Sequence, residues 1–253
     1  MKIRILSIFI FAVSLFSACT REETRPTAYS EFIINPPQFS SIGAKSYWTT
    51  GHNFYWDETG DCLFINGDRF QIKKEGGIWR SYKETGDVGT STEDINNNFY
   101  IAYVGSGPEW TELYFDASSG NYKANCDEDG DNVCQVPLAA VVNTNFVTLN
   151  PCCAVLIVAT TNDEGYMDIE GGYGKFAKAG TINTELAFFE DVDEWMDLDY
   201  IEIPTGQTVI VLPMVSNEEV VAKINFHLGS VELSTTADQI RIKKGCVYYI
   251  NLE

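Results

Sequence analysis

The chain has 253 residues, of which 45% are hydrophobic and 13% aromatic, so it is too apolar for a disordered chain and is expected to fold. Its 17 Lys and Arg residues against 36 Asp and Glu residues give a net charge of −19. This charge excludes nucleic acid as a partner and disfavours anionic lipid headgroups, because both would repel the chain. Only two histidines occur, His52 and His227, which excludes metal sites built from several histidines.

The first 18 residues have the pattern of an export signal. Lys2 and Arg4 form a basic start, residues 5–16 are almost entirely apolar, and residues 17–18 are the small residues expected before a cleavage site. The apolar run is shorter than the ~20 residues that a membrane-spanning helix requires. We therefore expect residues 1–18 to be removed as a signal peptide and the mature chain not to be an integral membrane protein.

Cys19 follows directly, and the five residues that end with it, Leu-Phe-Ser-Ala-Cys, resemble a bacterial lipobox. An ordinary signal peptide followed by a chance cysteine is the alternative. A lipobox implies that Cys19 carries several acyl chains, which are enough for stable membrane anchoring. Residues 19–30 are polar and contain Pro26, so they are expected to form a lipidated tether.

Acidic residues directly after the cysteine, here Glu22 and Glu23, resemble the signal that sends lipoproteins of some Gram-negative anaerobes to the outer face of the outer membrane. We therefore expect the protein at the cell surface, held in the outer membrane by its lipid.

Beyond residue 30, apolar and polar residues alternate with a period of two, which is typical of strands that bury one face. The alternation is strict in residues 69–73, and the preceding Asn66-Gly67 has the chemistry of a type I′ turn, so these residues should form a hairpin with Cys62–Ile65. Many short strands separated by turn clusters predict β-sandwich packing. Further strands are expected at residues 31–35, 78–82, 99–104, 112–115, 139–142, 154–160, 208–212, 220–228, 240–243 and 247–252.

A domain boundary is expected between residues 134 and 135, where an acidic loop ends and Pro137 precedes a new apolar region. It divides the chain into residues 31–134 and 135–253, each large enough for about seven strands. One segment, residues 185–196, has ambiguous apolar spacing and is the only helical candidate. The expected fold class is all-β, with two β-sandwiches in tandem.

Six cysteines remain beyond Cys19, and an even number in an exported chain favours disulfides. Cys126 and Cys134 bracket a polar loop, and a hairpin closed by a disulfide between them is the preferred pairing. Cys152 and Cys153 are adjacent in an apolar run, where alternation points them to opposite faces, so they are not expected to pair with each other. A buried thiol is the expected state of one or both.

The order of several motifs resembles that of the fimbrillin family. The segment from Trp56 to Asp61, with the apolar run after it, is similar to the family's W…GD segment, and Phe99–Tyr103 is similar to its aromatic strand ending the first half. Downstream, residues 135–140, 152–158, 211–213 and 242–252 match its later segments in order. The resemblance implies two transthyretin-like β-sandwich domains of the type V pilus group, whose members are made as lipoproteins and exported to the cell surface.

In that family a protease removes the first strand after an Arg or Lys, and a strand from the next subunit fills the groove by β-augmentation. Between the first expected strand and the W…GD segment the only Lys or Arg is Lys45, which is therefore the candidate processing site. An arginine-specific protease would have nothing to cut there. The last apolar run, residues 247–252, is expected to pair within the β-sandwich of its own chain. The chain is therefore not expected to polymerise through a carboxyl-terminal donor strand. These two differences from the family pattern, no arginine to cut and no spare last strand, favour an anchor, an accessory or tip-like subunit, or a non-polymerising surface relative over a stalk pilin.

The sequence gives only weak signals for metal binding or catalysis. The acidic loop 127–132 lacks the spacing of an EF-hand, because its glycine comes too early and Leu138 stands where the twelfth-position Glu should be. A solvated turn is preferred there. A second acidic cluster lies in residues 190–199 and could supply a pair of carboxylates for glycoside hydrolysis, but a charged loop around Trp195 is preferred. We expect His52 and His227 to be structural. That second cluster consists of Glu190, Asp191, Asp193, Glu194, Asp197 and Asp199.

Five aromatic residues could form a platform for sugars, although core packing is the commoner fate of aromatics on alternating strands. They are Trp48, Tyr55, Trp56, Trp79 and Tyr82.

Taken together, the sequence predicts a non-enzymatic, lipid-anchored, fimbrillin-like protein of the cell surface, located in the outer membrane and associated with fimbriae. It would act through strand and protein contacts with other fimbrillin-like subunits or with host or bacterial surface proteins, and its membrane contact would be the lipid on Cys19. No catalytic residue, metal or cofactor is expected. The alternative is a glycan-binding surface lipoprotein of a polysaccharide-uptake system.

Overall fold

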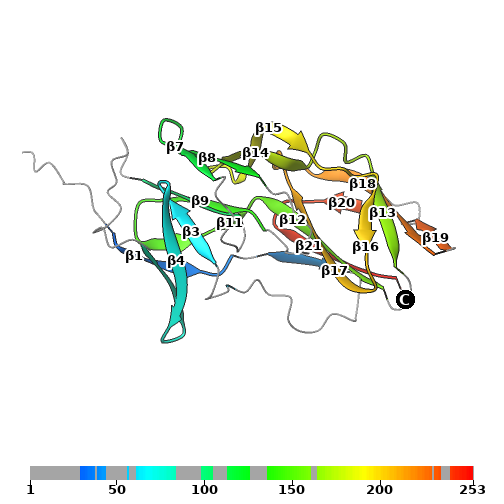
Figure 1. Ribbon diagram of the computed structural model, residues 1–253, viewed down its shortest axis with the longest axis horizontal. Helices are drawn as coiled ribbons and strands as arrows, with labels where there is room; N and C mark the ends of the chain where they lie inside the picture. Colours follow the sequence, from blue (N-terminus) through cyan, green and yellow to red (C-terminus); the bar gives the residue numbers. More distant parts are fainter. Residues whose placement is uncertain are drawn as a thin grey trace, which may run out of the picture.

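The computed structural model describes residues 29–37, 39–43, 56, 61–83, 98–104, 113–125, 136–160, 164–229, 231–234 and 240–252. The described residues form strands and turns without a helix, and the strands make four sheets, so the expected all-β fold class is confirmed (Figure 1). The ambiguous helical candidate, residues 185–196, is not a helix. Those residues enter β15 (Phe188–Trp195), because only Ala187 and Phe189 are buried there, which is too narrow an apolar face for a helix.

An eight-stranded sheet, called the amino-terminal sheet, holds most of the first half of the chain. Both predicted strands of the hairpin at Asn66-Gly67 are present in it, and both turn residues have positive φ, 49° and 85°, so the type I′ turn is confirmed. In spatial order its strands are β10 (Phe146–Thr148), β1 (Glu31–Asn35), β5 (Ile78–Lys83), β4 (Asp68–Glu75), β3 (Cys62–Ile65), β6 (Phe99–Tyr103), β9 (Leu138–Val142) and β11 (Asn150–Pro151).

Two further sheets follow along the long axis of the molecule (Figure 1). The central sheet consists of β17 (Gly206–Pro213), β12 (Cys153–Thr160), β21 (Cys246–Asn251) and β2 (Ser40–Gly43). The carboxyl-terminal sheet consists of β16 (Ile201–Ile203), β13 (Gly165–Glu170), β18 (Val220–Leu228) and β19 (Val231–Ser234), with β20 (Ile240–Ile242) paired to β18.

The fourth sheet, called the flanking sheet, covers the outer face of the amino-terminal sheet. It consists of β15, β14 (Ala177–Asn183), β8 (Asn121–Asn125) and β7 (Tyr114–Asp116). Its buried residues form one core with the outward residues of β6 and β9, and Tyr122 of β8 is the largest fully buried side chain in it.

The central sheet contributes to two cores because its strands are buried on both faces. Cys153, Val155 and Ile157 of β12 join the core of the amino-terminal sheet. The intervening Ala154 and Leu156 join the core against the carboxyl-terminal sheet. The period of two therefore assigns successive residues of one strand to different halves of the molecule.

The expected domain boundary at residues 134 and 135 falls in a part of the chain outside the described residues and stays a prediction. Strands on both sides of it share sheets. β9 pairs with β6, and β10 pairs with β1, in the amino-terminal sheet. β8 pairs with β14 in the flanking sheet.

Candidate strand-exchange site

β1 occupies a slot between two strands that come from distant parts of the chain. It pairs antiparallel with β5, from Glu31 opposite Tyr82 to Ile34 opposite Trp79. On its other side it pairs parallel with β10, and the backbone N–H of Ile33 donates to the carbonyl of Asn145 at 2.8 Å. β1 is thus hydrogen-bonded along both edges, and the short β10 is the edge strand beyond it.

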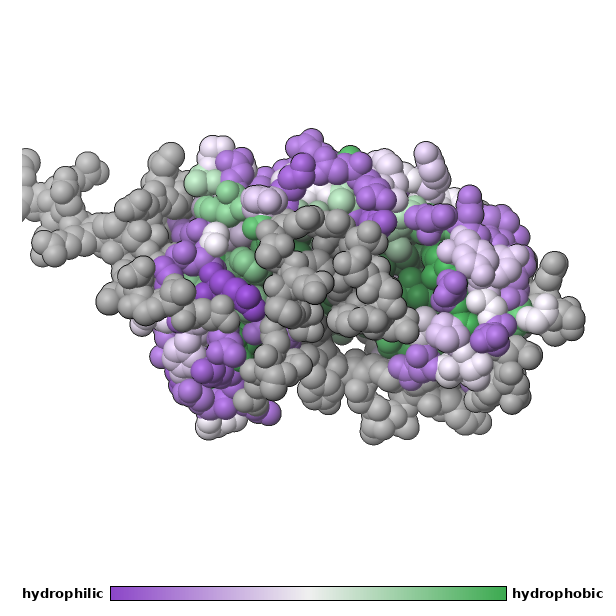
Figure 2. Space-filling model, viewed as in Figure 1, coloured by the Kyte–Doolittle hydropathy of each residue, from purple (hydrophilic) through white to green (hydrophobic). Residues whose placement is uncertain are grey.

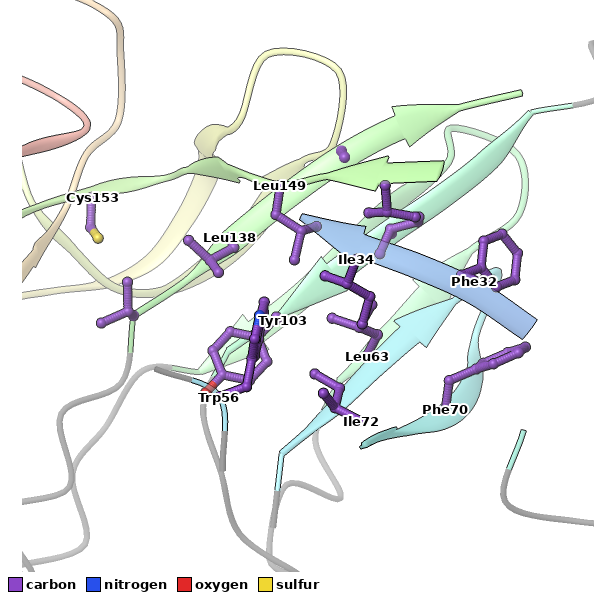
Figure 3. Close-up of a cluster of buried hydrophobic side chains, with 14 of the residues drawn as sticks. Phe32, Ile34, Trp56, Leu63, Phe70, Ile72, Tyr103, Leu138, Leu149 and Cys153 are labelled. Carbon is purple, nitrogen blue, oxygen red and sulfur yellow. The ribbon is translucent and has the colours of Figure 1, made fainter. Parts of the chain in front are cut away.

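The inward side chains of β1 are anchors of the amino-terminal core. Phe32 and Ile34 are fully buried, and Figure 3 shows both pointing from β1 into the cluster. The Phe32 ring packs edge-on against Phe70 of β4 at a centroid distance of 5.5 Å and against Phe99 of β6 at 5.0 Å. Removing β1 would expose rings on two other strands, so its seat is a preformed apolar groove.

Polar groups fix the ends of β1. The Arg80 guanidinium donates to the Glu31 carboxylate, and this contact raises the pKa of Arg80. At the other end the Asn35 amide donates to the hydroxyl of Thr148 at 3.0 Å. Pro36 and Pro37 then end the strand, because proline has no N–H for a sheet ladder.

A few residues later the same segment enters a second sheet. β2 pairs parallel with β21 and forms the edge of the central sheet, with Ser40 opposite Cys246 and Gly43 opposite Tyr249. Residues 31–43 therefore contribute a strand to the amino-terminal sheet and another to the central sheet. The sequence predicted β1 with its observed bounds and did not predict β2, because four residues carry too little alternation.

β21, the last described strand, is held on both sides. It pairs parallel with β12 from Val155 opposite Val247 onward, and with β2 on its other edge. The Tyr248 hydroxyl accepts from the N–H of Lys243 and donates to the carbonyl of Arg241, both at 2.7 Å, and burial raises its pKa to about 12. This strand is therefore paired within its own chain, as the sequence predicted.

The W…GD motif lies beside the β1 seat and is structural. Trp56 is buried, with its ring edge-on to that of Tyr103 at 5.0 Å. The Tyr103 hydroxyl donates to the buried Asp61 carboxylate at 2.8 Å, and the Asp61 carbonyl accepts the N–H of Ile72 at 3.1 Å. A carboxylate inside the core is thus satisfied by a tyrosine on β6.

The predicted site residues Cys19, Lys45, Cys126 and Cys134 all lie outside the described residues, so their roles stay predictions. Cys152 and Cys153 are described. Both are buried thiols, and they belong to different cores, which confirms that alternation separates them.

The second acidic cluster is spread along β15 and the residues after it, and its side chains contact separate partners. Glu190 accepts from Asn121, Asp193 pairs with Lys123 at 3.0 Å, and Glu194 pairs with Lys178 at 3.0 Å. The expected charged loop is therefore largely a strand. Among the described residues no group of His, Cys, Asp and Glu has a metal-binding arrangement.

The described members of the aromatic platform do not assemble. Trp56 is in the core, whereas Trp79 and Tyr82 are three positions apart on β5 and so face opposite sides of the sheet. Trp48 and Tyr55 lie outside the described residues. Nε2 of His227 donates to the Asp168 carboxylate at 2.9 Å, and its ring stacks on Tyr166, which agrees with a structural histidine. His52 lies outside the described residues.

Within the described ranges no helix has the length and apolar character needed to cross a bilayer. No family model matches the sequence, and no curated protein matches it.

The fold is similar to several solved structures. One is a candidate cell adhesion protein of Bacteroides uniformis, 9% identical with a TM-score of 0.43, over 78% of this chain and 88% of that chain. Another is a candidate cell adhesion protein of Bacteroides ovatus, 13% identical with a TM-score of 0.37, over 90% and 94%. A third is a carboxyl-terminally truncated tip fimbrial protein of Porphyromonas gingivalis, 8% identical with a TM-score of 0.34, over 77% and 88%.

These neighbours are adhesion and fimbrial proteins, the kind that a resemblance to the fimbrillin family implies. Because the identities and TM-scores are low, we infer function from the residues of this chain.

Proposed function

We propose that this protein reaches the outer-membrane surface as a lipid-anchored, fimbrillin-like protein. It would then take part in adhesion or pilus assembly as an acceptor in strand exchange, once cleavage has released the segment that carries Cys19. The proposal rests on the resemblance of the sequence to the fimbrillin family and on one structural observation. β1 is a five-residue strand with two fully buried anchors, and the chain that follows it contains one cleavable basic residue, Lys45, before the W…GD motif.

A cut after Lys45 would detach β1 and β2 together, because residues 31–43 precede it. Loss of β1 would leave the edge of β5 and the core beneath it open, and loss of β2 would leave the edge of β21 open. Unpaired strand edges above an apolar groove are the arrangement that β-augmentation requires. The proposed cut therefore converts a closed molecule into an acceptor with two neighbouring edges.

The geometry of the seat defines the strand that can replace β1. The incoming strand must run antiparallel to β5 and place a carboxylate opposite Tyr82, where Arg80 now binds Glu31. It must place an aromatic residue opposite Ser81 and a branched aliphatic residue opposite Trp79, in the positions of Phe32 and Ile34. We expect a donor with this acidic-aromatic-x-aliphatic pattern.

β21 is less suited to be a donor, because β12 and β2 occupy its two edges. Withdrawing it would break the pairing with β12 inside the central sheet and open both cores to which that sheet contributes. This favours the accessory, tip or anchor role over that of a stalk subunit.

The test is limited trypsin cleavage at Lys45 followed by size-exclusion chromatography with a labelled peptide that reproduces residues 29–37. Cleaved protein should bind the peptide once the native segment is displaced, whereas uncleaved protein should not. A peptide with Ser at positions 32 and 34 is the matched control, since it keeps the backbone and loses both anchors. Binding of the control as tightly as the native peptide, or elongation of the protein alone into multimers that resist detergent, would contradict the proposed acceptor role.

The anchor is tested separately by mass spectrometry of the membrane-extracted protein. The mass should match residues 19–253 plus several acyl chains, and Cys19→Ala should abolish membrane retention. Full retention of the Cys19→Ala protein would exclude the lipid anchor without affecting the strand-exchange proposal.

A further inference from the structure

The hairpin of β4 and β5 carries a charge opposite to that of the rest of the chain. Residues 68–83 contain five Lys or Arg residues and two Asp or Glu residues, a net charge of +3 in a chain whose net charge is −19. The basic residues are Arg69, Lys73, Lys74, Arg80 and Lys83.

The outer part of this hairpin, residues 73–80, includes an end, residues 73–78, that extends beyond the core. Ile72 is the last fully buried residue of β4, and residues 73–78 are all exposed. The ladder continues to Glu75 opposite Ile78, and a Cβ placed on Gly76 or Gly77 would meet nothing within 4 Å. Figure 1 shows the hairpin projecting from the sheet, and Figure 2 shows a mostly hydrophilic surface there.

Three residues of strand beyond Ile72 span about 10 Å, which is close to the Debye length of about 8 Å at physiological ionic strength. The acidic surface of the rest of the molecule is therefore largely screened at the hairpin end. Residues 73–78 carry two exposed lysines, Lys73 and Lys74, and one exposed carboxylate, Glu75, so the hairpin end has a net charge of +1 in an otherwise acidic protein.

Two apolar side chains lie near these lysines: Trp79, which is paired with Lys74 and packs against the core, and Ile78, which is paired with Glu75. Ile78, beside the turn, is 45% exposed. Trp79 is half-buried, and the Lys74 ammonium lies over its ring at 5.2 Å. An exposed aliphatic residue and a tryptophan bordered by lysines match the preference of the membrane interface, where tryptophan rings and lysine stems are apolar and their polar groups meet headgroups.

We propose that residues 73–80 contact anionic lipid headgroups of the membrane that carries the protein. The source of the membrane rests on the proposed acylation of Cys19. From Cys19 to Tyr29, the first described residue, the chain has ten residue steps, so the distance is at most about 35 Å. β1 follows at once and begins opposite Tyr82 of β5, four residues along the strand from Ile78, a distance of about 13 Å that the tether can span. An anchored chain therefore holds the hairpin near the bilayer at high effective concentration.

A bilayer also fits the shape of the contact. The hairpin end presents one aliphatic side chain, two lysines and one glutamate as a narrow projection. A fluid headgroup layer adapts to such a projection without needing a complementary shape. The net charge of the whole chain disfavours binding to anionic lipids. The β4–β5 hairpin is basic, so at this hairpin binding to anionic lipids is favoured.

The test uses the chain from Thr20 to Glu253, which holds every described strand and lacks Cys19, so that acylation cannot contribute. Flotation is measured with vesicles of phosphatidylcholine alone and of equal parts phosphatidylcholine and phosphatidylglycerol. The protein should float with the anionic vesicles at low salt, and raising the salt should release it.

Two matched pairs of variants locate the contact. Lys73→Glu should lower the partition coefficient by about fivefold or more, because one basic side chain near an anionic surface contributes a factor of about five, whereas Lys175→Glu, also exposed, makes the same charge change elsewhere and should have little effect. Ile78→Ser should weaken binding, whereas Leu186→Ser should not, and the two side chains are 45% and 47% exposed. Unchanged unfolding midpoints would show that the variants remain folded.

Absence of flotation by the native chain, equal flotation with neutral vesicles, or equal loss in both members of a pair would overturn the proposal. Binding to polyglutamate with the same dependence on Lys73, without binding to vesicles, would assign the hairpin to an acidic protein instead. Acylation of Cys19 is measured independently by mass, so failure of the anchor and failure of the hairpin contact give different results.

Discussion

The hydroxyl groups of two buried tyrosines each make two hydrogen bonds to the backbone at turns of the fold. Tyr122 of β8 reaches from the flanking sheet to the amino-terminal sheet, where it donates to the carbonyl of Tyr100 at 2.8 Å and accepts the N–H of Gly67 at 3.1 Å. Burial raises its pKa well above the ordinary value of a tyrosine. Tyr248 holds the turn before β21 in the same way.

Tyr122→Phe should lower the free energy of unfolding by about 1 kcal/mol, because it removes the hydrogen bonds to Gly67 and Tyr100 and no apolar contact, while the Tyr100 carbonyl still accepts the N–H of Asn66. Urea denaturation followed by fluorescence measures the change. Tyr114→Phe on the neighbouring β7 is the control, since Tyr114 is exposed and its substitution should change stability by no more than about 0.5 kcal/mol. Equal losses in both variants would mean that the Tyr122 hydroxyl is not a link between the sheets.

Tyr248 should make stability depend on alkaline pH. Its pKa is about 12 in the folded protein and about 10 in an unfolded chain. The folded state therefore holds its proton more tightly, so the stabilisation is complete below pH 10 and is lost as the pH rises through 12. The stability advantage of the native protein over Tyr248→Phe should shrink between about pH 10 and pH 12. Because all other tyrosines are common to both proteins, a difference that stays constant over this range would contradict the assignment.

At the residue scale, the sequence identified the motif residues that prove to be buried, but it did not identify the side chains that form hydrogen bonds between sheets. Trp56 and Asp61 stood out through their motif, and both are in the core. Tyr122 stands in a polar stretch, Gly120-Asn121-Tyr122-Lys123, that gives no sign of its partners. Its bonds join residues 22 and 55 positions away, and such contacts follow from tertiary packing, which local pattern does not encode.

At the element scale, strict alternation and turn chemistry were reliable. Strands with a buried face, such as β4 and β18, were predicted close to their observed bounds. The sequence missed β13, β14 and β15, where glycine, threonine and carboxylates dilute the apolar period. These strands are stabilised across the sheet, as in the pair of Lys178 with Glu194, and not by apolar alternation alone. The sequence also missed the short strands β2, β10, β11 and β16, which have between two and four residues and so offer little pattern.

Substitution at Gly67 tests how the β3–β4 hairpin packs beneath the flanking sheet. Gly67 has φ of +85°, and a Cβ there would lie 3.2 Å from Cβ of Phe115. Gly77, in the β4–β5 turn, has nearly the same φ, +84°, with open space around it. Both Gly→Ala variants carry the left-handed strain of about 1–2 kcal/mol. Gly67→Ala should lose more stability in urea denaturation, and the excess reports the contact with Phe115. Identical losses would show that Phe115 of the flanking sheet moves aside without lowering the free energy of unfolding.

At the scale of the whole molecule, the amino-terminal segment and the central sheet join the two halves. β1 and β2 place adjacent pieces of one segment in different sheets, and β12 contributes alternate residues to two cores. The sequence predicted the fold class and the order of most strands. It could not show the parallel pairings β1–β10 and β2–β21, because each joins residues more than 100 positions apart and leaves no local signal.

Cleavage at Lys45 should therefore loosen two sheets at once. Before cleavage β1 is bonded to β5 and β10, and β2 is bonded to β21, within one covalent chain. After cleavage the segment is held only by non-covalent contacts, whose loss is no longer reversed by a tethered strand at high effective concentration. Hydrogen exchange followed by mass spectrometry should show faster exchange in β5 and in β21, whereas β17 should keep its protection through its pairing with β12.

A chain with Lys45→Gln, treated with the same protease, is the control and should exchange at the native rate throughout. Adding the peptide of residues 29–37 to the cleaved protein should restore protection in β5 and leave β21 exposed, because that peptide contains β1 and lacks β2. Faster exchange confined to one of the two strands would show that β1 and β2 are released independently. A single cut would then open one acceptor edge, and the second strand would need a separate event to leave its sheet.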